Sequence, residues 1–122
     1  MSGFRKPKFH LFSNTQYALE GLWEVFRNET PFKIEVILFF VLSFVAIMLP
    51  IMTTYKMILI IVMFIPLMAE LTNSAIERIV DLASPDYHDM AKKAKDAASA
   101  VVFVSLTMTA CVWGSVLYLA FS

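Results

Sequence analysis

The chain of 122 residues contains little glycine and only one cysteine. Its three glycines, Gly3, Gly21 and Gly114, are too scattered for a glycine-rich phosphate loop, which excludes a Walker A motif and a dinucleotide fingerprint. The single cysteine, Cys111, excludes a disulfide within the chain, and its apolar surroundings indicate a packing role. Net charge is zero, which argues against nucleic acid as a partner. No cleavable signal peptide is expected, because no apolar core follows the basic start.

Apolar residues are present in excess. They make up 59% of the sequence, and the mean hydropathy is +0.71, above the usual range for a soluble domain. A soluble fold this short could not bury so much apolar surface, so the sequence predicts a membrane protein. Three runs are long and apolar enough to cross a bilayer, and we expect spans at 33–52, 55–81 and 96–121.

Residues 13–29 have helical spacing but too many charges for a span. One face is apolar and includes Leu19, Leu22 and Trp23, and the opposite face carries Glu20 and Glu24. Such a helix lies in the membrane surface. The alternative, an amphipathic helix packed on a soluble core, has little soluble core to pack against. The expected fold is therefore an all-α single domain, 1–122, with one surface helix and three transmembrane helices.

Two local motifs predict helix boundaries. Ser13 and Gln16 have the spacing of a capping box, which predicts that the surface helix begins there. Ser84-Pro85 resembles the start of a helix after the second span. Pro66 is expected to kink the second span and free a backbone carbonyl.

The basic residues predict the orientation in the membrane. Nine of the ten lysines and arginines, including Arg5, Lys6 and Lys8, precede the first span or separate the second from the third, and Lys56 is the exception. By the positive-inside rule, this side is cytoplasmic. The N-terminus is therefore expected in the cytoplasm and the C-terminus outside.

A polar stripe runs along the end of the second span. Glu70, Asn73, Glu77 and Asp81 share one helical face, with Ser74 beside them. Glu70 should lie ~22 Å into a hydrocarbon core of ~30 Å, near its inner boundary. A charge at that depth costs roughly 3 kcal/mol to insert and marks a functional candidate, here a general base. The alternatives are a polar seam between helices and, for Asp81, a solvated helix end.

Other charged and polar groups are expected at the same membrane face. They end the surface helix or open the first and third spans: Asn28, Glu29, Glu35, Lys95, Asp96 and Ser99. Mg²⁺ prefers a few carboxylates plus phosphate oxygens, and phosphoryl transfer also needs a cation on the phosphates. The pattern therefore predicts a magnesium–nucleotide site. Lys92 and Lys93 have an alternative role as an anchor to anionic lipids.

Two other classes of protein remain open from the residues alone. A small proton-coupled transporter would also use an intramembrane glutamate such as Glu70, but it would not explain the gathering of Glu29, Lys95 and Asp96. A purely structural membrane subunit is the third possibility.

The polar stripe also resembles a known family. The stretch ELTNSAIERIVD at 70–81, followed by DYH at 86–88 and AKDAASA at 94–100, is similar to the small bacterial membrane diacylglycerol kinases. RNE at 27–29 and FKIE at 32–35 extend the resemblance, which covers roughly residues 10–122. It implies a homotrimer in the bacterial inner membrane, with active sites shared between neighbouring chains. The implied reaction transfers the γ-phosphate of ATP to a lipid alcohol, most simply diacylglycerol.

The resemblance also implies a role for individual residues. Glu70 is the general base, and Glu29 and Glu77 hold Mg²⁺. The implied nucleotide-binding residues are Tyr17, Glu29, Asn73, Glu77, Asp86, Tyr87, His88, Lys95 and Asp96. The implied substrate-binding residues are Glu35, Glu70 and Ser99. His88 has the alternative of being an ordinary surface histidine.

Three positions concern how closely the chain follows the family. His10 stands where close relatives often carry a nucleotide-binding arginine, and Arg5, Lys6 or Lys8 could substitute for it. Ala98 stands where the diacylglycerol branch usually has glycine and the undecaprenol branch often has alanine. Ser74 fits the diacylglycerol branch better. An undecaprenol kinase therefore remains the alternative within the family.

Overall fold

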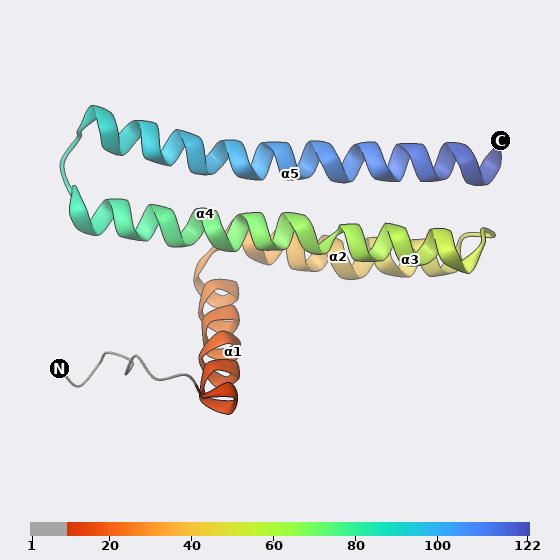
Figure 1. Cartoon of the computed structure of the whole chain (residues 1–122), viewed down its shortest axis with the longest axis horizontal. Coiled ribbons are helices and arrows are strands. Elements are labelled where there is room, and N and C mark those ends of the chain that lie inside the picture. Colours follow the sequence, from red (N-terminus) through yellow and green to blue (C-terminus); the bar gives the residue numbers. More distant parts are fainter. Residues whose placement is uncertain (1–9) are drawn as a thin grey trace.

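The computed structural model describes residues 10–122, so Arg5, Lys6 and Lys8 lie outside the described residues. Over that range the chain forms five helices and no strand (Figure 1): α1 (Leu11–Asn28), α2 (Thr30–Met48), α3 (Thr53–Val62), α4 (Phe64–Ala83) and α5 (Asp89–Phe121). Three segments are long and apolar enough to cross a membrane, namely α2, the combined α3–α4 and α5. The expected all-α membrane fold with three spans is confirmed.

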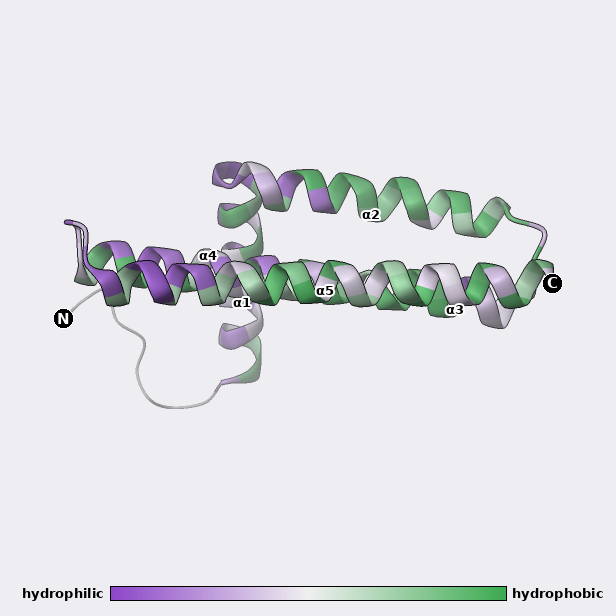
Figure 2. Ribbon diagram, turned by 90° about the horizontal axis from the view of Figure 1, so that it is seen from above, coloured by the Kyte–Doolittle hydropathy of each residue, from purple (hydrophilic) through white to green (hydrophobic). Residues whose placement is uncertain are grey.

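The α3–α4 segment is the central span. In its most apolar stretch of 18 residues, 44% of the residues are buried inside the chain. The buried share of the corresponding stretch is 11% in α2 and 11% in α5. Figures 1 and 2 together show α5 running alongside α3–α4, with α2 on a different side of the same segment. In both views α1 lies across the direction of the spans, as a helix in the membrane surface would.

The surface helix begins earlier than its capping motif predicts. Its N-cap is His10, which makes no side-chain capping bond, and Ser13 lies inside the helix. The predicted capping box is therefore wrong. The Gln16 amide instead donates to Glu20 at 3.2 Å, an i,i+4 contact along the exposed helix surface. The helix ends where Glu29 adopts an extended backbone, and α2 then starts with proline in its first turn.

The second span is interrupted at Met63, between α3 and α4. Pro66 has no N–H for the carbonyl one turn earlier, which favours a break there. The Met63 N–H bonds to the Ile60 carbonyl, one residue short of the α-helical acceptor, Leu59. The Leu59 carbonyl instead accepts the indole N–H of Trp113 on α5 at 3.1 Å. The second span is thus interrupted close to Pro66, and α5 pairs the Leu59 carbonyl at this interruption.

The apolar core lies at the end of the bundle where α2 turns into α3. Ala46, Leu59 and Val116 are buried together, one from each span. The Lys56 ammonium donates to the Ile47 carbonyl at 2.6 Å, and so pairs a backbone acceptor at the end of α2.

The opposite end of the bundle is polar, as the hydropathy colours of Figure 2 show for α4, α5 and the start of α2. Here α4 ends at Ala83, and α5 begins only at Asp89. Ser84-Pro85 therefore does not start a helix, because the Ser84 hydroxyl bonds to the Asp86 carbonyl at 2.9 Å within the loop. His88 caps α5 instead, its Nδ1 accepting the Met90 N–H at 3.1 Å.

Candidate active site

A row of buried polar side chains lies on α4, inside the second span. Glu70, Asn73 and Ser74 are 5%, 8% and 4% exposed. The Asn73 amide nitrogen lies 3.5 Å from Glu70 Oε1 and 3.4 Å from Glu77 Oε1, so it can donate to both carboxylates. Asn73 thus ties the deep carboxylate of Glu70 to the more exposed carboxylate of Glu77, one turn of helix closer to the polar end.

Glu35 on α2 faces this row from the neighbouring span. Its charge interacts with that of Glu70, and its Oε2 is buried with no hydrogen-bond partner. The same carboxyl group lines a small hollow of about 100 Å³ between the spans, together with Pro66 and Thr109. Asn73 Oδ1 is also buried and unpaired. Unpaired buried acceptors are rare in folded proteins and here leave two oxygens available to a donor such as a hydroxyl.

Glu29 lies at the junction of α1 and α2 and reaches towards α4. Its Oε1 accepts two bonds from the Arg78 guanidinium, from Nη2 at 3.0 Å and from Nε at 3.3 Å. Arg78 Nη1 also bonds to Glu24 on α1 at 2.5 Å. This hydrogen bond lowers the pKa of the Glu24 carboxyl below its ordinary value. Arg78 therefore holds Glu29 against the stretch of α4 that also carries Glu77.

The α4–α5 loop closes around a polar hollow of about 290 Å³. Two ion pairs line it, Lys95–Asp81 at 2.5 Å and Lys92–Asp96 at 2.7 Å. Five of the nine predicted nucleotide residues contribute to its lining: Asp86, Tyr87, His88, Lys95 and Asp96. The folded chain thus brings the loop residues and the start of α5 together at the polar end of the stripe.

The phenol of Tyr87 is anchored within the same loop. It donates to Asp89 Oδ1 at 2.8 Å, and this bond raises the pKa of Tyr87 above its ordinary value. His88 is exposed and caps α5, which agrees with the alternative prediction of an ordinary surface histidine. Both side chains hold the loop conformation that forms the hollow.

Ser99, one of the predicted site residues, does not join this cluster within one chain. Ser99 is exposed on α5 and has no hydrogen-bond partner among residues 10–122, whereas Ala98 beside it is 2% exposed and faces the bundle. Tyr17 is 36% exposed on α1. A single chain therefore supplies the carboxylates and the lysine, but it does not bring Ser99 to Glu70.

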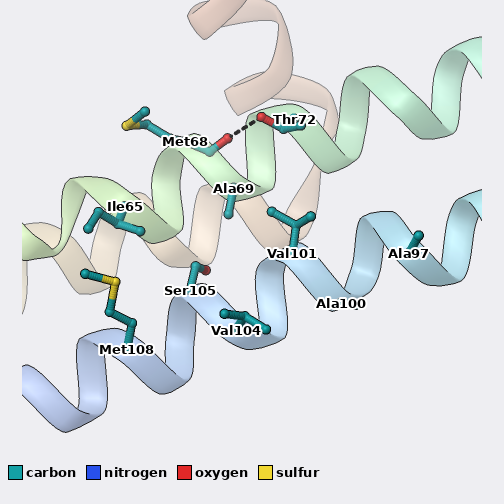
Figure 3. A pocket seen from close by; sticks show the side chains of 10 residues that line it. All are labelled: Ile65, Met68, Ala69, Thr72, Ala97, Ala100, Val101, Val104, Ser105 and Met108. Carbon is teal, nitrogen blue, oxygen red and sulfur yellow. Dashed lines mark hydrogen bonds between the residues drawn. The ribbon is translucent and has the colours of Figure 1, made fainter.

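An apolar groove of about 600 Å³ runs between α4 and α5. Figure 3 shows its lining from both helices, including Met68 and Ala69 of α4 and Val101 and Ser105 of α5. The Thr72 hydroxyl at its edge is bonded to the Met68 carbonyl at 2.9 Å, so no free donor faces the groove from that residue (Figure 3). The groove begins one residue from Glu70 and can accept hydrocarbon.

The donor set fits Mg²⁺ held together with a nucleotide. Among residues 10–122 no group of three or more His, Cys, Asp or Glu side chains is arranged to hold a metal alone. Mg²⁺ is commonly held by one or two carboxylates, with phosphate oxygens and waters completing the shell. Glu29 and Glu77 provide two such carboxylates, and both act electrostatically on Glu70.

Two residues that contribute to this arrangement, Arg78 and Glu24, were not predicted as functional from the sequence. They are 54 positions apart, and no local pattern pairs them. Periodicity reports which side chains share a face of one helix, but not which face of another helix they meet.

Comparison with known proteins places the chain among membrane enzymes. The sequence profile of the prokaryotic diacylglycerol kinases matches residues 16–117. A diacylglycerol kinase of Haemophilus influenzae is 39% identical over 110 residues, which cover 89% of this chain and 92% of that protein. The Pseudomonas aeruginosa diacylglycerol kinase is 38% identical over 107 residues, covering 88% and 87%. The Escherichia coli K12 diacylglycerol kinase is 29% identical over 97 residues, covering 80% of each.

The family match extends from the surface helix into the last turns of α5, so it includes the whole polar row of α4 and the α4–α5 loop. Neither the transporter nor the structural subunit accounts for such a match. The chain belongs to the prokaryotic diacylglycerol kinase family and is a multi-pass membrane lipid kinase.

Proposed function

We propose that this chain phosphorylates diacylglycerol with ATP, at the cytoplasmic face of the bacterial inner membrane, to give phosphatidic acid. The observation that carries the proposal is the buried carboxyl group of Glu70, which Asn73 ties to Glu77 at the polar end of a membrane span. A carboxylate at this depth suits a substrate whose reactive hydroxyl stays at the membrane surface while its acyl chains stay in the bilayer.

Glu70 acts as the general base in this proposal. Its carboxylate takes the proton of the lipid hydroxyl as that oxygen forms a bond to the γ-phosphorus of ATP. The bond between the γ-phosphorus and the β,γ-bridging oxygen breaks, and ADP leaves with that oxygen. The unpaired carboxyl oxygen of Glu35 is available to accept a bond from the second polar group of the lipid head. Ser99 would approach the same head from a neighbouring chain.

The nucleotide is held at the polar end of α4 and α5. Lys95 and Asp96 lie beside the loop hollow, where Lys95 supplies a cation for the phosphates. Glu29 and Glu77 would hold Mg²⁺, which neutralises charge on the triphosphate when it is bound. Asp86, Tyr87 and His88 shape the hollow, and Tyr17 reaches the nucleotide from the surface helix.

A homotrimer with active sites shared between chains completes the proposal. Its support is the open architecture of one chain, in which only 11% of the most apolar stretch of α2 and of α5 is buried and Ser99 is exposed. Three thin spans cannot enclose a nucleotide and a lipid, so a second chain is needed to close the site.

The lipid substrate is tested with the purified enzyme in detergent, using labelled ATP with diacylglycerol or undecaprenol under matched conditions. We expect faster transfer to diacylglycerol, because the three relatives compared above are diacylglycerol kinases. Faster transfer to undecaprenol would assign the chain to the other branch, in line with alanine at position 98, a buried site where the added methyl group bears on helix packing. Transfer to neither lipid would contradict the proposed function.

A further inference from the structure

Among residues 10–122, Arg78 is the one basic group that contacts the expected metal carboxylate Glu29, and the proposed reaction gives it no task. It lies on α4 directly after Glu77. Its guanidinium reaches out of α4 to two carboxylates, bonding to Glu29 through Nη2 and Nε and to Glu24 through Nη1. We call these three residues, Arg78, Glu24 and Glu29, the Arg78 clamp.

The clamp holds the point where the chain changes direction. Glu29 is the single residue between α1 and α2, with φ −116° and ψ 108°, so no helix fixes the direction of its side chain. A guanidinium presents its donors in a rigid plane. Two of these donors, Nε and Nη2, converge on the same Glu29 oxygen, Oε1, and so hold that oxygen beside Arg78. The third donor, Arg78 Nη1, bonds to the Glu24 carboxylate and extends this restraint to the last turns of α1.

Packing between α1 and α4 is loose beside the clamp. An apolar hollow of about 630 Å³ separates them, lined by α1 residues such as Trp23 and Phe26 and by Leu67 and Leu71 of α4. Apolar contact alone therefore leaves room for α1 to shift relative to α4. The clamp supplies a directional contact across this gap, and the lowered pKa of Glu24 agrees with a carboxylate held by Arg78.

We propose that Arg78 is a positioning residue, which holds Glu29 and the end of the surface helix against α4 and so places the Glu29 carboxylate beside Glu77 for metal binding. The proposal rests on the assignment of Glu29 and Glu77 to Mg²⁺ in the proposed function. Arg78 touches neither substrate in this scheme and acts through Glu29.

The test compares Arg78→Ala and Arg78→Lys with Arg27→Ala as a matched control. Arg27 is an exposed arginine in the last turn of α1 with no ion pair among residues 10–122. Its loss changes the net charge equally and removes no bond of the clamp, although its charge also acts on Glu24, as the smallest of the causes that lower the Glu24 pKa. Spin labels at Glu20→Cys and Leu82→Cys, both exposed, report the distance between α1 and α4 in a Cys111→Ser background. Labelled chains are diluted into unlabelled ones, so that only distances within one chain are read.

The second measurement is the binding of Mn²⁺ with a non-hydrolysable ATP analogue, followed by the magnetic resonance signal of the metal, and it needs no turnover. In Arg78→Ala we expect a broader distance distribution and a several-fold weaker metal affinity. Arg78→Lys should fall between, since lysine keeps the charge but loses the planar set of donors. Arg27→Ala should match the wild type in both measurements.

Several results would overturn the positioning role. If the metal affinity of Arg78→Ala is unchanged, the clamp is only a structural contact, whether or not the distribution of distances between α1 and α4 becomes broader. Weaker metal binding with unchanged distances would mean that Arg78 acts on the site directly. A wild-type enzyme that binds the metal and the analogue but phosphorylates no lipid would contradict the proposed function instead, because neither clamp measurement depends on transfer.

Discussion

Glu70 and Glu77 are the same residue type on the same face of α4, but their surroundings differ. Glu70 is 5% exposed inside the span, whereas Glu77 lies nearer the polar end and is only partly buried. Asn73 stands between them and can donate to one oxygen of each. Burial suits Glu70 to take a proton from a lipid hydroxyl, while partial exposure suits Glu77 to meet a hydrated cation.

Replacing Glu77 tests the metal role directly. Glu77→Ala should raise the magnesium concentration needed for half-maximal rate by roughly tenfold, the scale seen when groups that tune metal sites are lost. Glu20→Ala, which removes an exposed carboxylate from the outer face of α1, is the matched control. A magnesium titration of Glu77→Ala that coincides with the control would remove Glu77 from the metal site.

The pH response of the surface helix follows from the lowered pKa of Glu24, whose largest cause is its hydrogen bond with Arg78. A carboxyl group with a lowered pKa contributes stability that is present above its ordinary value of 4.5 and is lost as the pH falls through the lowered one. A spin label at Glu20→Cys should therefore keep its mobility from neutral pH down to about 4.5 and loosen below it. In Glu24→Gln the label should be more mobile already at neutral pH, and identical profiles in the two proteins would contradict this.

Among the elements, the broken second span depends most on its neighbour. At the break, the Met63 N–H does not bond to the Leu59 carbonyl. The indole N–H of Trp113 on α5 donates to this carbonyl instead, so a side chain of α5 replaces a backbone hydrogen bond of α3. This bond ties the two spans near the apolar core of Ala46, Leu59 and Val116. Pairing of backbone groups by an adjacent helix is the usual way in which a proline kink is tolerated within a membrane.

Trp113→Phe should destabilise the folded protein by about 1 kcal/mol, the usual net value of one hydrogen bond, while the KM for ATP stays unchanged. Unfolding in mixed detergent measures the loss. Trp23→Phe is the control, since Trp23 is 59% exposed on α1 and stacks on Phe26 without a described hydrogen bond. Equal stability of the two variants would show that the hydrogen bond from Trp113 to the Leu59 carbonyl does not stabilise the folded protein.

At the scale of the whole molecule, one chain divides into two ends. The end with the α2–α3 turn holds the apolar core, and the other end holds the buried carboxylates, the ion pairs and the loop hollow. The most exposed spans, α2 and α5, flank the central one. Since Ser99 faces outward from the end that carries Glu70, the open sides of the chain are the natural place for a neighbouring copy to complete the site.

Shared sites predict rescue between two inactive variants. Chains with Glu70→Gln and chains with Ser99→Trp should each be inactive alone. Mixed at equal amounts, they should recover roughly a quarter of the wild-type rate, the share of sites that receives an intact Glu70 and an intact neighbouring Ser99. Activity no higher than that of either variant alone, in mixtures shown by crosslinking to contain both chains, would contradict sharing between chains.

Much of this molecule was predictable from its sequence, for identifiable reasons. Hydropathy gives the three spans because the bilayer imposes a length and a composition, and helical spacing gives the Glu70 stripe. Helix ends were less predictable. The motifs at Ser13 and Ser84 do not start helices, because a cap signal competes with the continuing helix at the first and with a local turn at the second.

Contacts between elements could not be derived from spacing. The pairing of Arg78 with Glu24 and Glu29 and that of Trp113 with Leu59 both join segments about fifty positions apart. They depend on how two helices are rotated against each other, which the pattern within one helix does not fix. The position of Ser99 relative to Glu70 depends on a second chain, for the same reason.

The rate of phosphoryl transfer by Glu70→Gln, measured beside its binding of the magnesium complex of an ATP analogue, tests the central claim most directly. Glutamine keeps the shape of the side chain but cannot accept the proton of the lipid hydroxyl. We predict that nucleotide binding persists, whereas transfer falls by about 10²-fold or more, the usual contribution of a general base. Transfer near the wild-type rate in this variant would contradict the assignment of Glu70.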